Sequence, residues 1–335
     1  MARRGDLVAT YEAPPNIALV KFWGVRDVER TLPYNSSLSV TLDQLRSRTT
    51  VRFDPGLADD RVVLNREIAA PGPRQGVVEL LDRVRTLAGR SERAEVTSSN
   101  NFPMATGLAS SASGFAALAG AATAALGVTQ SDRGLSRLAR LGSGSAARSI
   151  FGGFVEWRAG VRADGFDSYA RTVYPPDYWP RLFDIIVRVR GAPVKEVRSS
   201  DAMQQTVATS PAYADRIAEI PRRLEAIRRA IGARDPDRLF PLVMEECDSF
   251  REVCETTRPS LDYLTATSRA VLGEVRAINR EAGRPRAAYT HDAGAHVHVF
   301  ALEPYVGPIR RRLARLPGVE QTQVVRPGPG AHRVS

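Results

Sequence analysis

Residues 101–118, NFPMATGLASSASGFAAL, are the most informative stretch of this sequence. Gly107 and the alanines and serines after it carry little side-chain bulk, so a ligand can approach the main chain closely. The stretch runs into an alanine-rich helical segment, and a helix N-terminus offers free N–H groups and a positive dipole to an anion. The pattern alone leaves two interpretations open. One is an anion-binding loop, and the other is a tight turn before a closely packed helix.

A second junction of small residues lies at residues 141–160, LGSGSAARSIFGGFVEWRAG. Ser143, Gly144 and Ser145 precede a short helical segment that carries Arg148. Two such loops facing separate anionic groups would suit a phosphoryl-transfer site. The alternative is a pair of ordinary packed loops with Arg148 on the surface of a helix.

Length and composition are those of a large globular protein, with 335 residues, 43% apolar and 25% charged. No apolar run approaches the roughly 20 residues that span a bilayer. The first residues, MARRGDLVATYEA, lack the apolar region of a signal peptide, so we expect a cytoplasmic protein without a membrane partner. Cys247 and Cys254 lie seven positions apart in a helical pattern and are expected to be buried thiols rather than a disulfide or zinc site.

The formal charge of +10 raises nucleic-acid binding as a rival function. The basic residues are interleaved with acidic ones, however, and neither a long basic run nor an aromatic RNA-binding signature occurs. We therefore expect a small anionic substrate and no nucleic-acid partner. Only Lys21 and Lys195 are lysines in a chain that otherwise uses arginine, which suggests that position 21 needs a compact ammonium group.

Alternation and helical spacing predict an α+β fold rather than a doubly wound parallel sheet. We expect strands within residues 8–21, 35–45, 48–54, 61–65, 93–103, 154–158, 183–190, 287–302 and 318–325. We expect helices at 75–88, from the serine-rich loop to about 126, and at 131–141, 214–231, 236–254, 261–282 and 305–316. Residues 192–206 are interpreted as a polar stretch, and residues 326–335, RPGPGAHRVS, as a frayed tail.

Taken together, the motifs resemble the GHMP kinase superfamily and, within it, the mevalonate diphosphate decarboxylase family. The matching segments, in the order of the family, are APPNIALVKFWGVRD, NSSLSVTLD, SSNNFPMATGLASSASGFAALA, RLGSGSAARSIFGGFVEW, MQQTVATSPAY and YTHDAG. The resemblance implies a two-lobed α+β fold with the active site in the cleft between the lobes. It implies a ribosomal S5 domain 2-like ATP-binding lobe over residues 1–182, a ferredoxin-like lobe over residues 183–327 and a flexible tail over residues 328–335.

The resemblance also implies ATP-dependent decarboxylation of a mevalonate phosphate in isoprenoid biosynthesis, with ATP and Mg²⁺ as cofactors and a homodimeric assembly. The γ-phosphoryl group passes to the C3 hydroxyl, and phosphate and CO₂ then leave to give an alkene. Asp292 matches the carboxylate that acts as base or orients the hydroxyl. Lys21 matches the ammonium beside it, and Arg148 matches the guanidinium that holds the substrate carboxylate.

Further binding residues follow from the same resemblance. The expected substrate contacts are Asn16, Phe22, Val25, Ser143, Gly144, Ser145, Arg148 and Ser200. The expected ATP contacts are Ser98, Asn100, Gly107, Leu108, Ala109, Ser110 and Ser111, with Ser111 also the candidate Mg²⁺ ligand. His296 and His298 could bind a metal from one face of a strand, but without an evident third ligand we favour packing or surface roles.

Departures from the family pattern bear on the substrate. The family's KYWGK reads KFWGV here, so Phe22 lacks a hydroxyl and Val25 replaces a lysine, while Ser200 replaces an arginine of many bacterial members. Losing an ammonium that faces a diphosphate removes a charge-assisted hydrogen bond worth ~1.5–3 kcal/mol. We therefore predict mevalonate 5-phosphate as substrate and isopentenyl phosphate as product.

Four alternatives to this prediction remain open. The enzyme could act on mevalonate 5-diphosphate, with Arg198 supplying the missing charge. It could also be a 3-kinase that stops after phosphoryl transfer, or a decarboxylase that does not use ATP. The fourth alternative is a basic nucleic-acid-binding protein.

Overall fold

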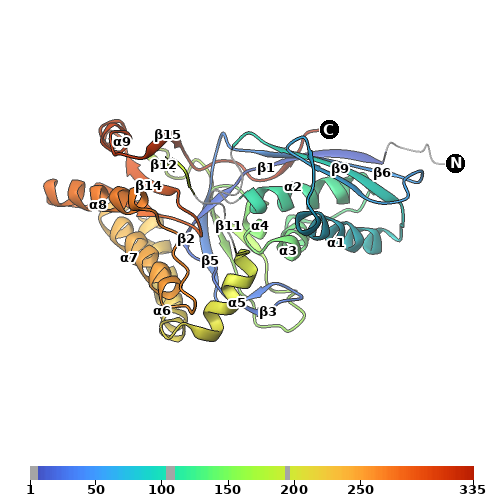
Figure 1. The fold of residues 1–335 in the computed structure, drawn as a ribbon, viewed down its shortest axis with the longest axis horizontal. Coiled ribbons are helices and arrows are strands. Elements are labelled where there is room, and N and C mark those ends of the chain that lie inside the picture. The colour runs from blue at the N-terminus through green and yellow to red at the C-terminus, as the bar shows by residue number, and fades with distance from the viewer. Residues whose placement is uncertain (1–6, 103–109, 193–196) are drawn as a thin grey trace.

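The computed structural model describes residues 7–102, 110–192 and 197–335, which form two lobes lying side by side (Figure 1). The N-terminal lobe contains a six-stranded sheet in the order β16-β1-β6-β9-β7-β8 and a four-stranded sheet in the order β11-β10-β5-β2. The C-terminal lobe contains a four-stranded sheet in the order β13-β14-β12-β15, covered by long helices. The α+β class expected from the sequence is confirmed.

The strands and helices of the N-terminal lobe have the following bounds. The six-stranded sheet comprises β1 (Val8–Ala13), β6 (Ser47–Asp54), β7 (Arg61–Leu64), β8 (Glu67–Ile68), β9 (Arg93–Asn100) and β16 (His332–Arg333). The four-stranded sheet comprises β2 (Asn16–Val20), β5 (Ser37–Thr41), β10 (Phe154–Trp157) and β11 (Ala170–Tyr174), and β3 (Val25–Asp27) pairs with β4 (Leu32–Pro33). The helices are α1 (Pro71–Ala88), α2 (Ser110–Ala125), α3 (Asp132–Gly142) and α4 (Ala146–Ser149).

The C-terminal lobe follows in the chain. Its sheet comprises β12 (Leu182–Val189), β13 (Ala287–Thr290), β14 (Val297–Leu302) and β15 (Val319–Val325). Its helices are α5 (Ser199–Thr209), α6 (Tyr213–Gly232), α7 (Pro236–Glu255), α8 (Ala266–Glu281) and α9 (Val306–Ala314). Within the described residues, no helix is long and apolar enough to cross a membrane.

Helix α2 explains the alanine and glycine content of the opening stretch. It lies against β1 and β6, and 11 of its 16 residues are buried. Small side chains let the helix approach the sheet closely: a Cβ atom at Gly120 would collide with the ring of Tyr11. The close packing that the sequence left as an alternative is therefore present, and it coexists with a helix that begins at the candidate anion-binding loop.

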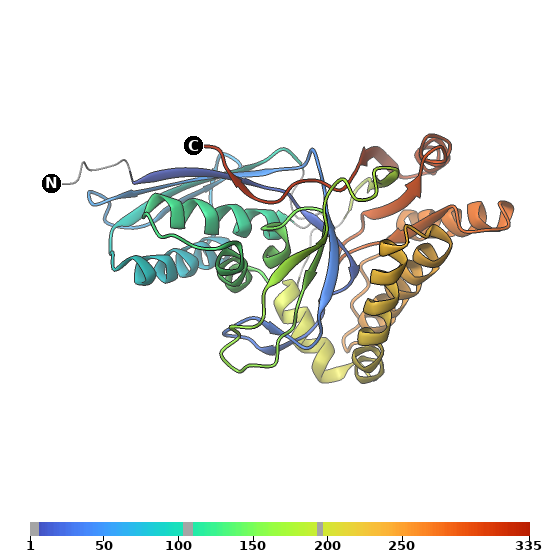
Figure 2. The same ribbon diagram turned by 180° about the vertical axis from the view of Figure 1, so that it is seen from behind.

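An apolar core joins the two lobes. Strands β2 and β5 contribute Ile17, Leu19, Leu38 and Val40, and helices α6 and α7 contribute Ile220, Ile227, Phe240 and Val243. Each large apolar side chain that is fully buried stabilises the fold by about 1.5–3 kcal/mol. Both views show β2 and β5 beside these helices (Figures 1 and 2). Because β2 runs through this core, its end at Val20 delivers the next residue, Lys21, to the junction of the lobes.

Several elements differ from the sequence predictions. Helix α1 begins at Pro71 rather than residue 75, because proline is accommodated in the first helical turn, where the N–H groups have no intrahelical partner. Helix α8 begins at Ala266 rather than residue 261, and Thr265 caps it through a reciprocal pair of hydrogen bonds with Ser268. Helix α5 occupies the stretch interpreted as polar, and β11 was not anticipated.

The C-terminal residues were expected to fray but pack against the N-terminal lobe. Strand β16 pairs with β1, which places Arg333 opposite Tyr11. The N–H of Gly328 donates to Thr41 O at 2.8 Å, and Gly328 O accepts from Gly153 N at 2.9 Å. Figure 2 shows this segment running back along β1. Its glycines and prolines suggested disorder, but they permit close approach to the main chain of neighbouring strands.

Candidate active site

Lys21 and Asp292 form an ion pair at the junction of the lobes. Lys21 follows β2, and its Nζ donates to Asp292 Oδ1 at 2.8 Å and to Ala18 O at 2.7 Å. Asp292 lies in the loop between β13 and β14, with a quarter of its side chain exposed. The side chain of Lys21 is almost completely buried. The two residues predicted to act together therefore meet from different lobes, separated by 271 positions in the chain.

The surroundings of Asp292 keep its carboxylate ionised. Burial is the largest single influence and would raise the pKa of Asp292, but the Lys21 ammonium opposes it through both its charge and its hydrogen bond. His298 and Arg148 lower the pKa of Asp292 further, and the net result is a pKa below the usual 3.8. An ionised carboxylate with one oxygen on Lys21 can accept a proton or orient a hydroxyl with the other.

Arg148 is a buried cation surrounded by neutral groups. It lies on α4 with 2% of its surface exposed, and its Nε donates to Asn16 Oδ1 at 3.1 Å and to Ser39 Oγ at 3.0 Å. Its Nη1 donates to Ser37 Oγ at 2.6 Å. Within the described parts of the chain, no carboxylate forms an ion pair with this guanidinium. A buried charge without a counter-charge is costly, and an anionic ligand would offset that cost.

Burial also lowers the pKa of Arg148, to about 10, although the charge of Asp292 acts in the opposite direction. Arg148 therefore remains protonated at neutral pH. Asn16 Nδ2 donates to Ser149 Oγ at 2.8 Å, which fixes the amide that supports Arg148. The surface location that the sequence left open for Arg148 is wrong, and Asn16 contacts the guanidinium directly.

The two serine-containing loops converge. Ser143 Oγ lies 3.4 Å from Ser145 Oγ and 3.4 Å from Ser111 Oγ, which is in the first turn of α2. The loop is backed by the ring of Phe22, which packs edge-on against Trp157 with ring centroids 4.7 Å apart. A Cβ atom at Gly144 would collide with both aromatic rings, so only glycine fits there. Hydroxyls from the two candidate anion loops thus share one location.

The candidate ATP residues that the structure describes lie on the first turn of α2 and on β9. Ser110 and Ser111 open α2, while Gly107, Leu108 and Ala109 lie outside the described residues. Asn100, at the end of β9, accepts a hydrogen bond from Ser47 Oγ at 2.6 Å, and Ser47 also bonds to Ser113 of α2 at 2.6 Å. Ser98 bonds to Thr49 Oγ1 at 2.8 Å. These contacts fix the end of β9 relative to the start of α2.

The residues expected to choose the substrate are less polar than a diphosphate site would suggest. Val25 lies half-buried on β3 and packs against an apolar cluster that includes Trp23 and Met203. On α5, the exposed Ser200 bonds to Asp201 at 3.1 Å. Arg198, the residue considered as a replacement cation, is exposed and donates to Asp201 at 3.0 Å. The guanidinium of Arg198 is therefore engaged with a neighbouring carboxylate.

The remaining candidates have packing roles. His298 Nδ1 lies 2.6 Å from Asp184 Oδ2 in a buried pair, and His296 Nδ1 accepts from the Val189 N–H at 3.1 Å. No group of three potential metal ligands of the His, Cys, Asp and Glu types occurs in the described part of the chain. Both cysteines are buried free thiols, as predicted, and burial raises the pKa of Cys247 to about 11.

Sequence reasoning missed three residues of this region. Ser37 and Ser39 support Arg148, and their spacing of two on a strand was a usable signal because alternate residues share one face. Glu246 of α7 is fully buried and accepts from the main-chain N–H of Lys21 at 2.9 Å. Nothing in the local sequence distinguishes it from a solvated helical glutamate.

Family models match both lobes of the chain. The diphosphomevalonate decarboxylase-like N-terminal domain matches residues 13–170, and the mevalonate 5-diphosphate decarboxylase C-terminal domain matches residues 185–326. The chain belongs to the diphosphomevalonate decarboxylase family. The diphosphomevalonate decarboxylase of Aspergillus fumigatus is 42% identical over 311 residues, covering 88% of this chain and 77% of the relative. The human diphosphomevalonate decarboxylase is 41% identical over 325 residues, covering 91% of this chain and 80% of the relative.

Solved structures of diphosphomevalonate decarboxylases share the whole fold. The Staphylococcus aureus enzyme superposes with a TM-score of 0.91 at 34% identity, covering 98% of both chains. An Enterococcus faecalis enzyme gives 0.89 at 35% identity, covering 98% of this chain and 99% of the other. A further structure, solved with MVAPP, AMPPCP and magnesium, gives 0.91 at 35% identity over 98% of this chain and 99% of that chain. The GHMP kinase fold expected from the resemblance is thereby confirmed.

Proposed function

We propose that this protein catalyses ATP-dependent decarboxylation of mevalonate 5-diphosphate to isopentenyl diphosphate, ADP, phosphate and CO₂. The proposal rests on one arrangement: the Lys21–Asp292 pair beside Arg148, a buried cation with only neutral partners. The relatives named as diphosphomevalonate decarboxylases, at 41–42% identity, favour the diphosphate over the 5-phosphate predicted from the sequence. We therefore propose the 5-diphosphate as the main substrate and keep the 5-phosphate as the second candidate.

In the proposed mechanism the oxygen of the substrate's C3 hydroxyl attacks the γ-phosphorus of ATP. Asp292 accepts the proton of this hydroxyl or orients it for the attack. Lys21 holds Asp292 in place and offsets charge on the transferring group. Arg148 binds the substrate carboxylate in a planar fork and so aligns the bond that will break. When phosphate leaves C3, the electrons of the C1–C2 bond form the alkene and CO₂ departs. Asp292 then stabilises positive charge developing at C3.

The serines at the start of α2 are the candidate residues for binding ATP and Mg²⁺. The start of α2 offers a helix N-terminus to phosphate groups, and Ser111 places a hydroxyl within 3.4 Å of Ser143. Mg²⁺ commonly binds through one or two protein oxygens together with substrate phosphates, so Ser111 can be its protein ligand. The metal, when bound, would neutralise phosphate charge. We propose Ser98 and Asn100 as contacts near the nucleoside.

The second candidate substrate is mevalonate 5-phosphate. Val25 and Phe22 present no polar group, and Arg198 is engaged by Asp201, so the local charge suits a less charged substrate. The deciding experiment measures kcat/KM for CO₂ release with mevalonate, its 5-phosphate and its 5-diphosphate under identical conditions. A higher value for the diphosphate supports the main proposal, and a higher value for the monophosphate supports the second. Failure to release CO₂ from any of them refutes both.

We also propose a division near residue 182 into an ATP-binding lobe and a C-terminal lobe, in keeping with family models that match residues 13–170 and 185–326. Because one apolar core joins the lobes, we expect them to unfold in a single calorimetric transition. Two separate transitions would contradict that expectation. The homodimer expected from the sequence stays a prediction, and light scattering in solution tests it.

A further inference from the structure

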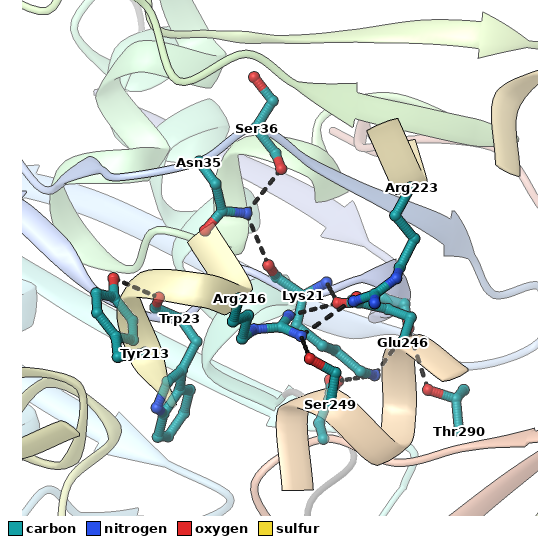
Figure 3. Close-up of polar contacts among 12 residues, drawn as sticks. Lys21, Trp23, Asn35, Ser36, Tyr213, Arg216, Arg223, Glu246, Ser249 and Thr290 are labelled. Carbon is teal, nitrogen blue, oxygen red and sulfur yellow. Dashed lines mark hydrogen bonds and ion pairs between the residues drawn. The ribbon is translucent and has the colours of Figure 1, made fainter. Parts of the chain in front are cut away.

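The main chain around Lys21 is held by side chains rather than by a neighbouring strand. After β2 ends at Val20, the N–H of Lys21 donates to Glu246 Oε1 at 2.9 Å, and its carbonyl accepts from Asn35 Nδ2 at 3.0 Å. Two residues further on, the carbonyl of Trp23 accepts from the Tyr213 hydroxyl at 3.1 Å. Figure 3 shows these groups converging on the Lys21–Trp23 segment from α6, α7 and the loop before β5.

Glu246 is the centre of this arrangement. It is completely buried on α7, and its carboxylate also accepts hydrogen bonds from Arg216 and Arg223 of α6. Arg216 is itself held by Ser249 Oγ at 3.1 Å. Two arginines donate to both oxygens of the carboxylate, so the acceptor that meets the Lys21 N–H has little freedom to move.

One explanation is that Glu246 only neutralises the buried Arg216. That role, however, requires no contact with the other lobe. Glu246 Oε1 is shared between Arg216 of its own lobe and the N–H of Lys21 across the lobe junction. Lys21 is consequently held at two points by carboxylates of the C-terminal lobe, with Glu246 on its main chain and Asp292 on its ammonium.

We propose that Glu246 is a positioning residue for decarboxylation, which fixes the main chain of Lys21 so that the ammonium meets Asp292. The inference rests on the proposed function, because it assigns Glu246 an effect on the same reaction. Glu246 touches neither the reacting atoms nor Asp292 and acts through Lys21 alone. Asn35 holds the carbonyl of the same residue, Lys21, and shares this role.

The first variant to test is Glu246→Gln, which keeps the size of the side chain but loses its charge. Misplacing a catalytic group by about 1 Å can cost about 100-fold in rate, so we expect kcat to fall by about 10- to 100-fold. The KM for ATP should stay unchanged, because Glu246 bonds to Lys21, Arg216 and Arg223, and none of these is among the candidate ATP contacts. Loss of kcat at constant KM for ATP is the first signature of positioning.

The pH dependence of kcat/KM supplies a second test of positioning, through its acid limb, the range in which activity falls as the pH is lowered. Asp292 faces Lys21, Arg148 and His298, with His291 next to it in the chain, and Lys21 is the largest of the influences that lower its pKa. If Lys21 moves away, the pKa of Asp292 rises, and activity is lost at a higher pH on the acid side. The ionisations of the substrate are the same for every variant, so the displacement of the limb relative to wild type reports on Asp292.

Asp60→Asn is the matched control for Glu246→Gln. Asp60 is also buried, also pairs with a buried arginine, Arg85, and also accepts from a main-chain N–H, that of Ala94 at 2.7 Å. It lies in the N-terminal lobe beside β7 and β9, away from Lys21. Asp60→Asn should lower Tm as Glu246→Gln does but leave kcat and the acid limb unchanged.

Asn35→Leu keeps the inference testable if Glu246→Gln does not fold. This variant releases the carbonyl of Lys21 without leaving a charged group unpaired. We expect it to lower kcat less than Glu246→Gln does and to move the acid limb in the same direction. If the folded Glu246→Gln and Asn35→Leu variants have wild-type kcat and an unchanged acid limb of kcat/KM, the positioning role of Glu246 is refuted. A wild-type enzyme that releases no CO₂ from any mevalonate ester overturns the proposed function instead.

Discussion

Replacing Arg148 by glutamine should separate stability from activity. Burial lowers the pKa of Arg148 to about 10, well below the usual value of an arginine. At about 1.4 kcal/mol per pH unit, this lowering means that the folded protein loses about 3 kcal/mol by holding the charge at neutral pH. The variant removes that cost but also removes the hydrogen bonds to Asn16, Ser37 and Ser39. Because their donor is charged, these bonds are worth about 1.5–3 kcal/mol each and more than offset the gain, so Tm should fall by a few degrees.

Activity should respond very differently to Arg148→Gln. Two charge-assisted hydrogen bonds to the substrate carboxylate, worth about 1.5–3 kcal/mol each, are lost in the proposed complex. Each 1.4 kcal/mol is about tenfold in rate, so kcat/KM should fall by at least about 100-fold. Differential scanning calorimetry and CO₂ release measure the two effects on the same sample. A large drop in Tm would show that Arg148 is structural, and near-normal kcat/KM would refute its role as carboxylate clamp.

Three further variants test other parts of the site. Asp292→Asn should lower kcat by about 100- to 10,000-fold while ATP binding persists, and normal turnover would exclude Asp292 as the base. Val25→Lys should raise the ratio of kcat/KM for diphosphate over monophosphate by about tenfold or more through one new charge-assisted hydrogen bond. An unchanged ratio would mean that position 25 does not face the 5-phosphoryl groups. Gly144→Ala should raise the KM for the mevalonate ester, because the new methyl group displaces Phe22 and the serine loop, and an unaltered KM would show that this loop does not bind substrate.

Much of this site could be anticipated from the sequence, because its residues belong to short local patterns. Lys21 was marked by the scarcity of lysine, and the loops around Ser111 and Ser143 by their small residues. That these groups meet is a property of the fold, since Lys21 and Asp292 are separated by 271 positions.

Other features left no local signal. Glu246 sits in a helix rich in charged residues, and only the packing of α6 and α7 against β2 buries it. Helix α5 was missed because its polar composition shows no clear apolar periodicity. The tail was misinterpreted because glycine and proline are equally common in disordered ends and in segments that approach other main chains closely.

The most direct test of the proposed mechanism is to measure, at the same time, the ADP and the CO₂ that the wild-type enzyme releases with mevalonate 5-diphosphate. The proposed roles of Lys21, Arg148 and Asp292 couple phosphoryl transfer to loss of the carboxyl group. We therefore expect equal amounts of ADP and CO₂ at every time point and no CO₂ without ATP. ADP release without CO₂ would indicate a 3-kinase, and CO₂ release without ATP would contradict the proposed mechanism.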